Sequence, residues 1–254
     1  MRIRATCLLT AVCVLMFGCS REPALTVYCA AGLRPPVAEL IETFSKREGV
    51  RVEAVYSGSG LLLAQIALAE RGDVYIAGDE FFMQQAVDRG FIEKQATAAY
   101  FIPVIAVAKG NPKGITTLAD LTRSDVKVGL GEAKSCAVGR SAAAMLQRAG
   151  LTAKVKPVVT TSTVNELGND LEIGTLDAAI LWDAVARFYP KKVDIIPISP
   201  EYREVVTVPV GVLKFTRRPA LAETFMRLVS GDEGKRIFAK HGYTTSLEKE
   251  DVEK

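Results

Sequence analysis

Two short turns rich in small residues have the composition of an anion site. Cys29-Ala30-Ala31-Gly32-Leu33 follows one apolar run, and Ser57-Gly58-Ser59-Gly60 follows the next. A helical pattern comes after each turn, so the backbone N–H groups of the turn would lie at a helix N-terminus. Unpaired donors and the helix dipole favour an anion there. Two such helix ends at one edge of a sheet predict a cleft that binds a small oxyanion.

Residue types suited to catalysis are sparse by comparison. His241 is the one histidine of the chain and lies far along the sequence from both turns, so a Ser-His-Asp triad could be built only around a distant residue. The Ser57–Gly60 turn lacks the G-x-S-x-G spacing of a nucleophile elbow. No G-x-x-x-x-G-K-S/T phosphate loop and no His, Cys and Asp cluster at metal-ligand spacing occurs. We therefore expect no catalytic residue, no resident cofactor and no free metal cation. A hydrolase with Ser59 as nucleophile is the enzymatic alternative.

The elements that would position the two turns alternate between strands and helices. Strands are expected at 25–29, 50–56 and 74–77, and helices from Pro35 to Gly49, at 61–69 and at 81–87. This β-α-β-α-β order implies a parallel sheet with helices on its faces.

A second set of elements follows an apolar strand expected at 101–108. It comprises helices at 118–121, 140–149, 164–173, 220–229 and 233–240, and strands at 126–130, 154–159, 178–182, 195–198 and 205–214. The economical arrangement is that the chain crosses to a second domain near Pro103 and returns near Val205. We therefore expect two Rossmann-like α/β domains joined by a two-crossover hinge, with the ligand in the cleft between them. Their expected limits are 24–103 plus 207–254 for the first domain and 104–206 for the second.

The N-terminus has the pattern of an export signal. Arg2 and Arg4 precede an apolar run from Ala5 to Phe17, which is too short to span a bilayer comfortably. The run ends in a sequence that resembles a bacterial lipoprotein cleavage box, which would make 1–18 the signal peptide and Cys19 the lipidated residue. An acylated Cys19 would tether the protein on the periplasmic side of the cell envelope. An ordinary cleaved signal is the alternative.

Charge and cysteine content limit the partners further. The net charge of the whole chain is +3, and removal of Arg2 and Arg4 with the signal would leave +1. This is too small to favour nucleic acid or an anionic membrane surface, so the lipid anchor would be the membrane contact. Cys29 and Cys136 remain in the mature chain and flank turns assigned to the cleft. We expect them to be free buried thiols, with a disulfide as the alternative.

Four segments resemble the periplasmic molybdate-binding proteins that feed ABC importers. They are Leu25–Leu33, Tyr56–Ile66, Gly72–Asp79 and Ile237–Tyr243, and their order and spacing cover almost the whole mature chain. The resemblance implies the type II periplasmic-binding-protein fold. It also implies a tetrahedral oxyanion held by hydroxyl and backbone N–H groups, without a formal positive charge.

Five ligand positions of that family carry over to this chain. The first-turn serine falls on Gly32, which has no hydroxyl and would act through its N–H group. The second-turn serine falls on Ser59 and is retained. The resemblance places backbone donors at Val138 and Val164, and it places Trp182 where the family has a tyrosine. The indole can donate a hydrogen bond but cannot accept one.

Neighbouring residues complete the expected site. Ala31, Gly60 and Asn165 are additional candidates for ligand contacts, because they adjoin the carried-over positions. Glu166 and Asp183 also lie close in sequence, and because a carboxylate repels an oxyanion we expect both to point away.

Each assignment has a structural alternative. Ser59 could serve only as a helix cap, Trp182 could be a buried strand residue of the core, and Gly32 and Gly60 could be required only by turn geometry.

The sequence therefore predicts a solute-binding protein that captures molybdate or tungstate for an ABC importer, acts with permease and ATPase subunits, and is monomeric. A different oxyanion or a small carboxylate is the alternative ligand. A ligand-sensing subunit of a membrane receptor is the alternative class of protein.

Overall fold

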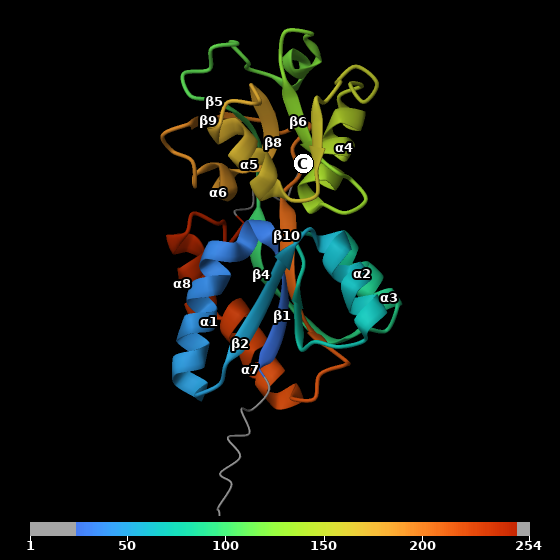
Figure 1. Ribbon diagram of the computed structural model, residues 1–254, viewed down its shortest axis with the longest axis vertical. Coiled ribbons are helices and arrows are strands. Elements are labelled where there is room, and N and C mark those ends of the chain that lie inside the picture. The colour runs from blue at the N-terminus through green and yellow to red at the C-terminus, as the bar shows by residue number, and fades with distance from the viewer. Residues whose placement is uncertain (1–23, 248–254) are drawn as a thin grey trace, which may run out of the picture.

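The computed structural model describes residues 24–247 and contains two five-stranded sheets. The sheets lie one above the other along the long axis of the molecule (Figure 1). We call the first sheet with its helices the first lobe, and the second sheet with its helices the second lobe. The expected signal peptide and Cys19 lie outside the described residues.

The first sheet has the strand order β2-β1-β3-β10-β4. Its strands are β1 (Leu25–Ala30), β2 (Val52–Ser57), β3 (Val74–Ile76), β4 (Ile92–Phe101) and β10 (Val206–Leu213). β1 pairs in parallel with β2 and β3, whereas β10 is antiparallel to β3 and β4. The parallel pairing expected for the β-α-β-α-β segment is confirmed, and β10 adds an antiparallel strand to the same sheet. β10 returns from the second lobe, so it begins at the edge of the sheet where β1, β2 and β3 end.

The second sheet has the order β7-β6-β8-β5-β9. Its strands are β5 (Pro103–Ala108), β6 (Val128–Gly131), β7 (Val159–Thr161), β8 (Ala178–Trp182) and β9 (Val193–Pro197). β6 pairs in parallel with β7 and β8, and β5 is antiparallel to β8 and β9. Here the antiparallel strand is the one that enters from the first lobe. The carboxyl ends of β6, β7 and β8 therefore face those of β1, β2 and β3.

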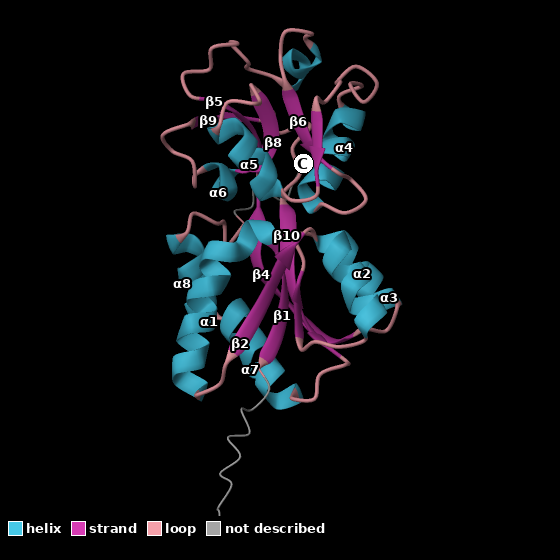
Figure 2. Cartoon of the chain, viewed as in Figure 1, coloured by secondary structure: helices cyan, strands magenta, loops and turns pink. Residues whose placement is uncertain are grey.

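Helices flank both sheets (Figure 2). Those of the first lobe are α1 (Arg34–Glu48), α2 (Ser59–Ala69), α3 (Glu80–Asp88), α7 (Pro219–Ser230) and α8 (Asp232–Lys240), preceded by the short 3-10 helix η1 (Ala31–Leu33). Those of the second lobe are η2 (Leu118–Thr122), α4 (Ala137–Arg148), α5 (Val164–Glu172) and α6 (Asp183–Ala186). α1, α7 and α8 contact one another, and α2 contacts α3.

Three sequence expectations differ from the structure. The single strand expected at 101–108 is divided at Ile102, because Phe101 ends β4 in one sheet and Pro103 begins β5 in the other. Most of β4 was not expected, since its first residues are largely exposed and polar. The strand expected at 154–159 is replaced by β7, which begins only at Val159.

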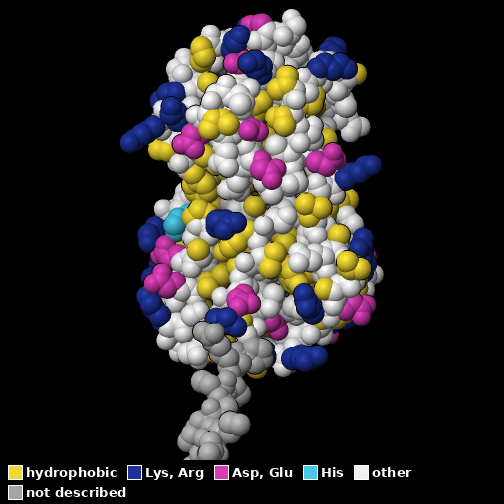
Figure 3. Space-filling view, viewed as in Figure 1, with side chains coloured by type: hydrophobic (Ala, Val, Ile, Leu, Met, Phe, Trp, Pro, Cys, Tyr) yellow, Lys and Arg dark blue, Asp and Glu magenta, His cyan; other side chains and the backbone are white. Residues whose placement is uncertain are grey.

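The hydrophobic core continues from one lobe into the other. One cluster of buried side chains includes Val27 and Phe101 of the first sheet and Val128 and Trp182 of the second. Figure 3 shows hydrophobic side chains along the boundary between the lobes. Among residues 24–247, no helix has the length and apolar character needed to cross a membrane. The expected two-domain α/β fold class is confirmed.

Candidate functional site

A small cavity lies between the facing strand ends of the two sheets. Its wall is formed by the last residues of β1, β2, β4 and β8 and by the first residues of η1, α2, α4 and α5. The centres of water molecules could occupy about 20 Å³ of it. A sphere of that volume has a radius of about 1.7 Å, and adding the roughly 1.4 Å radius of a water molecule gives a space about 3 Å in radius, the size of one small ion.

The cavity is electrostatically suited to an anion although its wall is uncharged. Within the described part of the chain, the residues that line it carry no charged side chain. The N-termini of α2, α4 and α5 all open onto it. The first turn of a helix has N–H groups without partners inside the helix, and it is the positive end of the helix dipole. The arrangement can hold an anion by hydrogen bonds alone.

Ser59 is the first residue of α2 and is 1% exposed. Its Oγ accepts a hydrogen bond from the Gly78 N–H at 2.9 Å, and α2 has no side-chain cap. The alternative that Ser59 only caps its own helix is therefore wrong. Because the Gly78 N–H occupies an acceptor position of the hydroxyl, the Ser59 proton is left to donate to an acceptor in the cavity.

The first turn lines the cavity with Ala31 and Gly32. A Cβ atom on Gly32 would lie 2.9 Å from Cγ1 of Val164 in the opposite lobe, and the φ angle of Gly32 is not in the left-handed region. Close approach of the second lobe, rather than turn geometry, therefore favours glycine here. The carbonyl of Gly32 accepts a hydrogen bond from the Tyr243 hydroxyl, so the C-terminal segment fixes the turn. Tyr243 was not among the expected site residues.

The second lobe contributes Val138 and Val164 to the wall, both buried. Val138 precedes the helix expected at 140–149, but α4 begins earlier and places this residue in its first turn. Val164 begins α5, where Thr163 and Glu166 form a capping box. The Glu166 carboxylate accepts from the Ser162 N–H at 3.0 Å and the Thr163 N–H at 3.3 Å. It is thus held away from the cavity.

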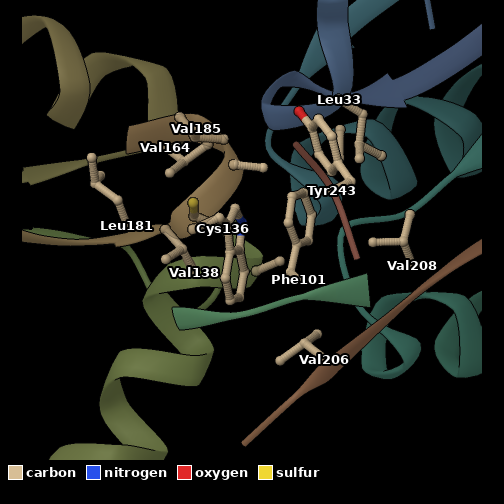
Figure 4. Close-up of a cluster of buried hydrophobic side chains, with 14 of the residues drawn as sticks. Leu33, Phe101, Cys136, Val138, Val164, Leu181, Val185, Val206, Val208 and Tyr243 are labelled. Atoms are coloured by element: carbon tan, nitrogen blue, oxygen red, sulfur yellow. The ribbon is translucent and has the colours of Figure 1, made fainter. Parts of the chain in front are cut away.

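Trp182 ends β8 and forms one side of the cavity. It is 2% exposed and stacks face to face on Phe101, with ring centroids 4.6 Å apart and planes 7° apart. Tyr243 packs on Phe101 at 5.7 Å, and Figure 4 shows Phe101 between Tyr243 and the side chains of the second lobe. Trp182 is therefore both a buried stacking residue and a cavity residue. Phe101, which also lines the cavity, was not anticipated.

Cys136 lines the cavity, although it was expected only to flank a turn of the cleft. Burial raises the pKa of its thiol to about 11, although the Gly139 and Val138 N–H groups act in the opposite direction. The thiol is therefore protonated at neutral pH. Cys136 and Cys29 are both buried and free, so neither forms the alternative disulfide.

Two of the additional contacts lie outside the cavity wall. The Gly60 N–H donates to the Ser135 carbonyl at 2.9 Å, which uses this donor for a contact between the lobes. Asn165 does not line the cavity, and its Oδ1 is buried without a partner. Asp183 is also absent from the wall, and burial raises the pKa of its carboxyl.

Two residues with hydroxyl groups line the cavity without having been among the expected ligand positions. These are Ser57 and Thr163. Ser57 ends a strand and Thr163 is the N-cap of a helix, and these positions are the sequence signal that could have identified them as cavity residues. No group of three or more His, Cys, Asp or Glu residues among positions 24–247 is arranged to hold a metal ion.

Known proteins share both the sequence pattern and the fold. The family model for bacterial extracellular solute-binding proteins matches residues 25–244. The molybdate-binding protein ModA of Mycobacterium bovis is 30% identical over 223 residues, which cover 87% of this chain and 84% of that protein.

Solved structures extend the comparison. The periplasmic molybdate-binding protein of Azotobacter vinelandii aligns with a TM-score of 0.74 at 19% identity, over 88% of this chain and 100% of that chain. The sulfate-binding protein SubI of Mycobacterium tuberculosis aligns with a TM-score of 0.76 at 18% identity, over 87% of this chain and 86% of that chain. At these identities the likeness is one of fold, and the expected type II periplasmic-binding-protein fold is confirmed. The expected resemblance to molybdate-binding proteins is confirmed by the sequence matches.

Proposed function

The chain belongs to the family of bacterial extracellular solute-binding proteins, and on that basis we propose that it captures molybdate or tungstate and delivers it to an ABC importer. The observation that carries the proposal is an uncharged, ion-sized cavity onto which the N-termini of three α-helices open. Such a wall offers hydrogen-bond donors to an oxyanion and no counter-charge to a cation. Its 30% identical relative from Mycobacterium bovis is a molybdate-binding protein.

The proposed ligand contacts come from both lobes. Gly32 and Ala31 contribute backbone N–H groups, Ser59 contributes its hydroxyl, and the second lobe contributes the N–H groups of Val138 and Val164. Trp182 donates its indole N–H where the family has a phenol. Because these donors converge only when the lobes are together, the ligand would stabilise the closed form.

The missing hydroxyl at Gly32 bears on which anion is preferred. A buried ligand oxygen left without a donor would cost about 1–3 kcal/mol. Ser57 and Thr163 line the same cavity and carry hydroxyl groups that can replace the lost donor. Molybdate, tungstate and sulfate accept hydrogen bonds alike, so the radius of the cavity would separate the larger anions from sulfate.

The partners and the location follow from the same proposal. The protein would act outside the cytoplasmic membrane as a monomer, tethered through a lipid on Cys19, and would present its ligand to the permease and ATPase subunits. We propose that the two domains meet at the two crossings of the chain, at Ile102 and just before Val206, within two residues of the limits expected from the sequence (24–103 plus 207–254, and 104–206).

Calorimetric titration of the purified mature protein with molybdate, tungstate, sulfate, phosphate and arsenate tests the ligand. We expect molybdate and tungstate to bind most tightly. The proposal is lost if none of the five binds with a Kd below about 0.1 mM, an affinity near 5.5 kcal/mol. Tight binding of sulfate or phosphate alone would replace the ligand but keep the oxyanion class. Binding of a small carboxylate instead would identify the alternative.

A further inference from the structure

One ion pair bridges the two lobes beside the cavity. Nε of Arg140, on α4 of the second lobe, donates to Oδ2 of Asp79 in the first lobe at 2.7 Å. The Asp79 side chain is fully buried, and the Arg140 side chain is 33% exposed. The guanidinium of Arg140 also lies 4.9 Å from the ring centre of Phe81, again across the lobe boundary.

Asp79 is fixed within its own lobe and is linked to the cavity. Its Oδ1 accepts from the Phe82 N–H at 3.0 Å and so caps α3. The residue before it is Gly78, whose N–H holds the Ser59 hydroxyl oxygen at 2.9 Å. Because Gly78 and Asp79 are joined by one peptide bond, a displacement of Asp79 would also move the Gly78 N–H that orients the Ser59 hydroxyl.

The lobes also touch at the second turn. The Gly60 N–H donates to the Ser135 carbonyl at 2.9 Å. A Cβ atom on Gly58 would lie 2.4 Å from the Ser162 carbonyl oxygen and 2.6 Å from that of Ser135. The two lobes are thus in direct contact next to the cavity on this side. The ion pair of Arg140 with Asp79 is the charged part of that contact.

We propose that Arg140 and Asp79 are positioning residues for ligand capture. They contact no ligand, but they stabilise the closed arrangement of the lobes and hold Gly78 where it orients the Ser59 hydroxyl. Opening separates the pair and allows water to reach the carboxylate. If Arg140 is removed, the closed form contains a buried carboxylate without its partner, whereas the open form does not, so the balance moves towards opening. The inference rests on the proposed function, in that the ligand is bound between the lobes.

The test compares Arg140→Met and Asp79→Asn with wild type. Methionine keeps much of the length of Arg140 and its packing on Phe81. Asparagine keeps the cap of α3, because its side-chain oxygen can accept from Phe82. Arg148→Met is the matched control: it lies on the same helix and pairs with Glu204 at 3.1 Å on the exposed surface of the second lobe.

We expect each of the first two variants to bind molybdate about tenfold more weakly, since each breaks a charge pair that closure buries. The double variant should bind molybdate within about twofold of the single variants, because either change alone already removes the same interaction. Arg148→Met should bind as wild type does. An affinity of Arg140→Met within about twofold of wild type overturns the inference. If Asp79→Asn fails to fold, Arg140→Met decides alone.

Small-angle X-ray scattering of the ligand-free protein separates this inference from the identity of the ligand. If wild type binds none of the oxyanions, the proposed function fails, and the ion pair is judged by scattering. A larger radius of gyration for Arg140→Met than for wild type and Arg148→Met supports its role in closure. Equal radii for all three proteins overturn it.

Discussion

The backbone N–H of Gly78 donates to the side-chain oxygen of Ser59 at 2.9 Å, from a turn nineteen residues further along the chain. This bond occupies the hydroxyl as an acceptor and leaves its proton for the cavity. The Ser59 hydroxyl therefore does not cap its own helix, and in the proposed site it donates to the ligand.

Replacement of Ser59 by alanine tests this role. The variant loses one hydrogen bond to a charged ligand, so affinity for molybdate should fall by roughly 1.5–3 kcal/mol, or about ten- to a hundredfold. Ser141→Ala is the control, because the Ser141 hydroxyl is buried without a partner and does not line the cavity. Calorimetry should detect the loss in the first variant only. An unchanged affinity for Ser59→Ala would leave its hydroxyl without a ligand role.

Trp182 allows binding to be followed directly, since it is the one tryptophan of the chain and lines the cavity. We expect its fluorescence to change on titration with molybdate. Trp182→Phe keeps an aromatic ring against Phe101 but removes the N–H donor, and should weaken binding by about 1.5–3 kcal/mol. Trp182→Tyr restores a donor and should bind more tightly than Trp182→Phe. Equal affinities of the two variants by calorimetry would show that the donor at this position is dispensable.

Gly58→Ala should obstruct closure without disturbing the turn. The backbone of Gly58, with φ −64° and ψ 143°, is accessible to alanine. The added methyl group would instead meet the carbonyls of Ser135 and Ser162 in the opposite lobe. We expect a loss of molybdate affinity of more than about tenfold, corresponding to 1.4 kcal/mol. Circular dichroism should show an unaltered fold. Retained affinity would contradict the need for this close approach.

Tyr243→Phe should affect both stability and binding. The change removes the donor to the buried Gly32 carbonyl, and an unsatisfied carbonyl costs about 1–3 kcal/mol. Because Gly32 lies in the cavity wall, ligand affinity should fall as well. Tyr189→Phe is the control: the Tyr189 hydroxyl bonds Asn169 at 2.8 Å within the second lobe, away from the cavity. Urea unfolding and calorimetry should find a binding defect only in Tyr243→Phe.

Stability should depend on pH through Glu39. Hydrogen bonds from Lys240 and His241 hold the pKa of the Glu39 carboxyl below its ordinary value of 4.5. Between the lowered value and 4.5 the unfolded chain binds more protons, so the stabilisation is present above 4.5 and is lost as pH falls through the lowered pKa.

Thermal unfolding of Glu39→Gln checks this dependence. The variant should melt below wild type at neutral pH, and the difference should vanish under strongly acidic conditions. Glu42→Gln is the control, because Glu42 pairs with Lys46 on the exposed face of the same helix. A difference for Glu39→Gln that persists unchanged in acid would contradict the prediction.

Local sequence determined the strand–turn–helix units that form the site. The apolar run before Ala30 folds as β1, and Gly49 ends α1 in the left-handed conformation that glycine favours. Thr163 and Glu166 cap α5 at the expected place. These features depend on residues a few positions apart, so periodicity and residue type are enough to predict them. The resemblance to molybdate-binding proteins, rather than these local signals, selected Gly32, Ser59, Val138, Val164 and Trp182, and all five line the cavity.

Only the tertiary structure decided how those units meet. β4 is polar over most of its length and becomes a strand by pairing with β10, more than a hundred residues later. Gly58 is glycine because carbonyls of the other lobe approach it, and Gly60 directs its N–H to Ser135 rather than to the cavity. Arg140 finds Asp79 across 61 residues, and Tyr243 finds Gly32 across 211. Such contacts arise from the packing of two lobes, which no local pattern encodes, and they determine which groups face the cavity.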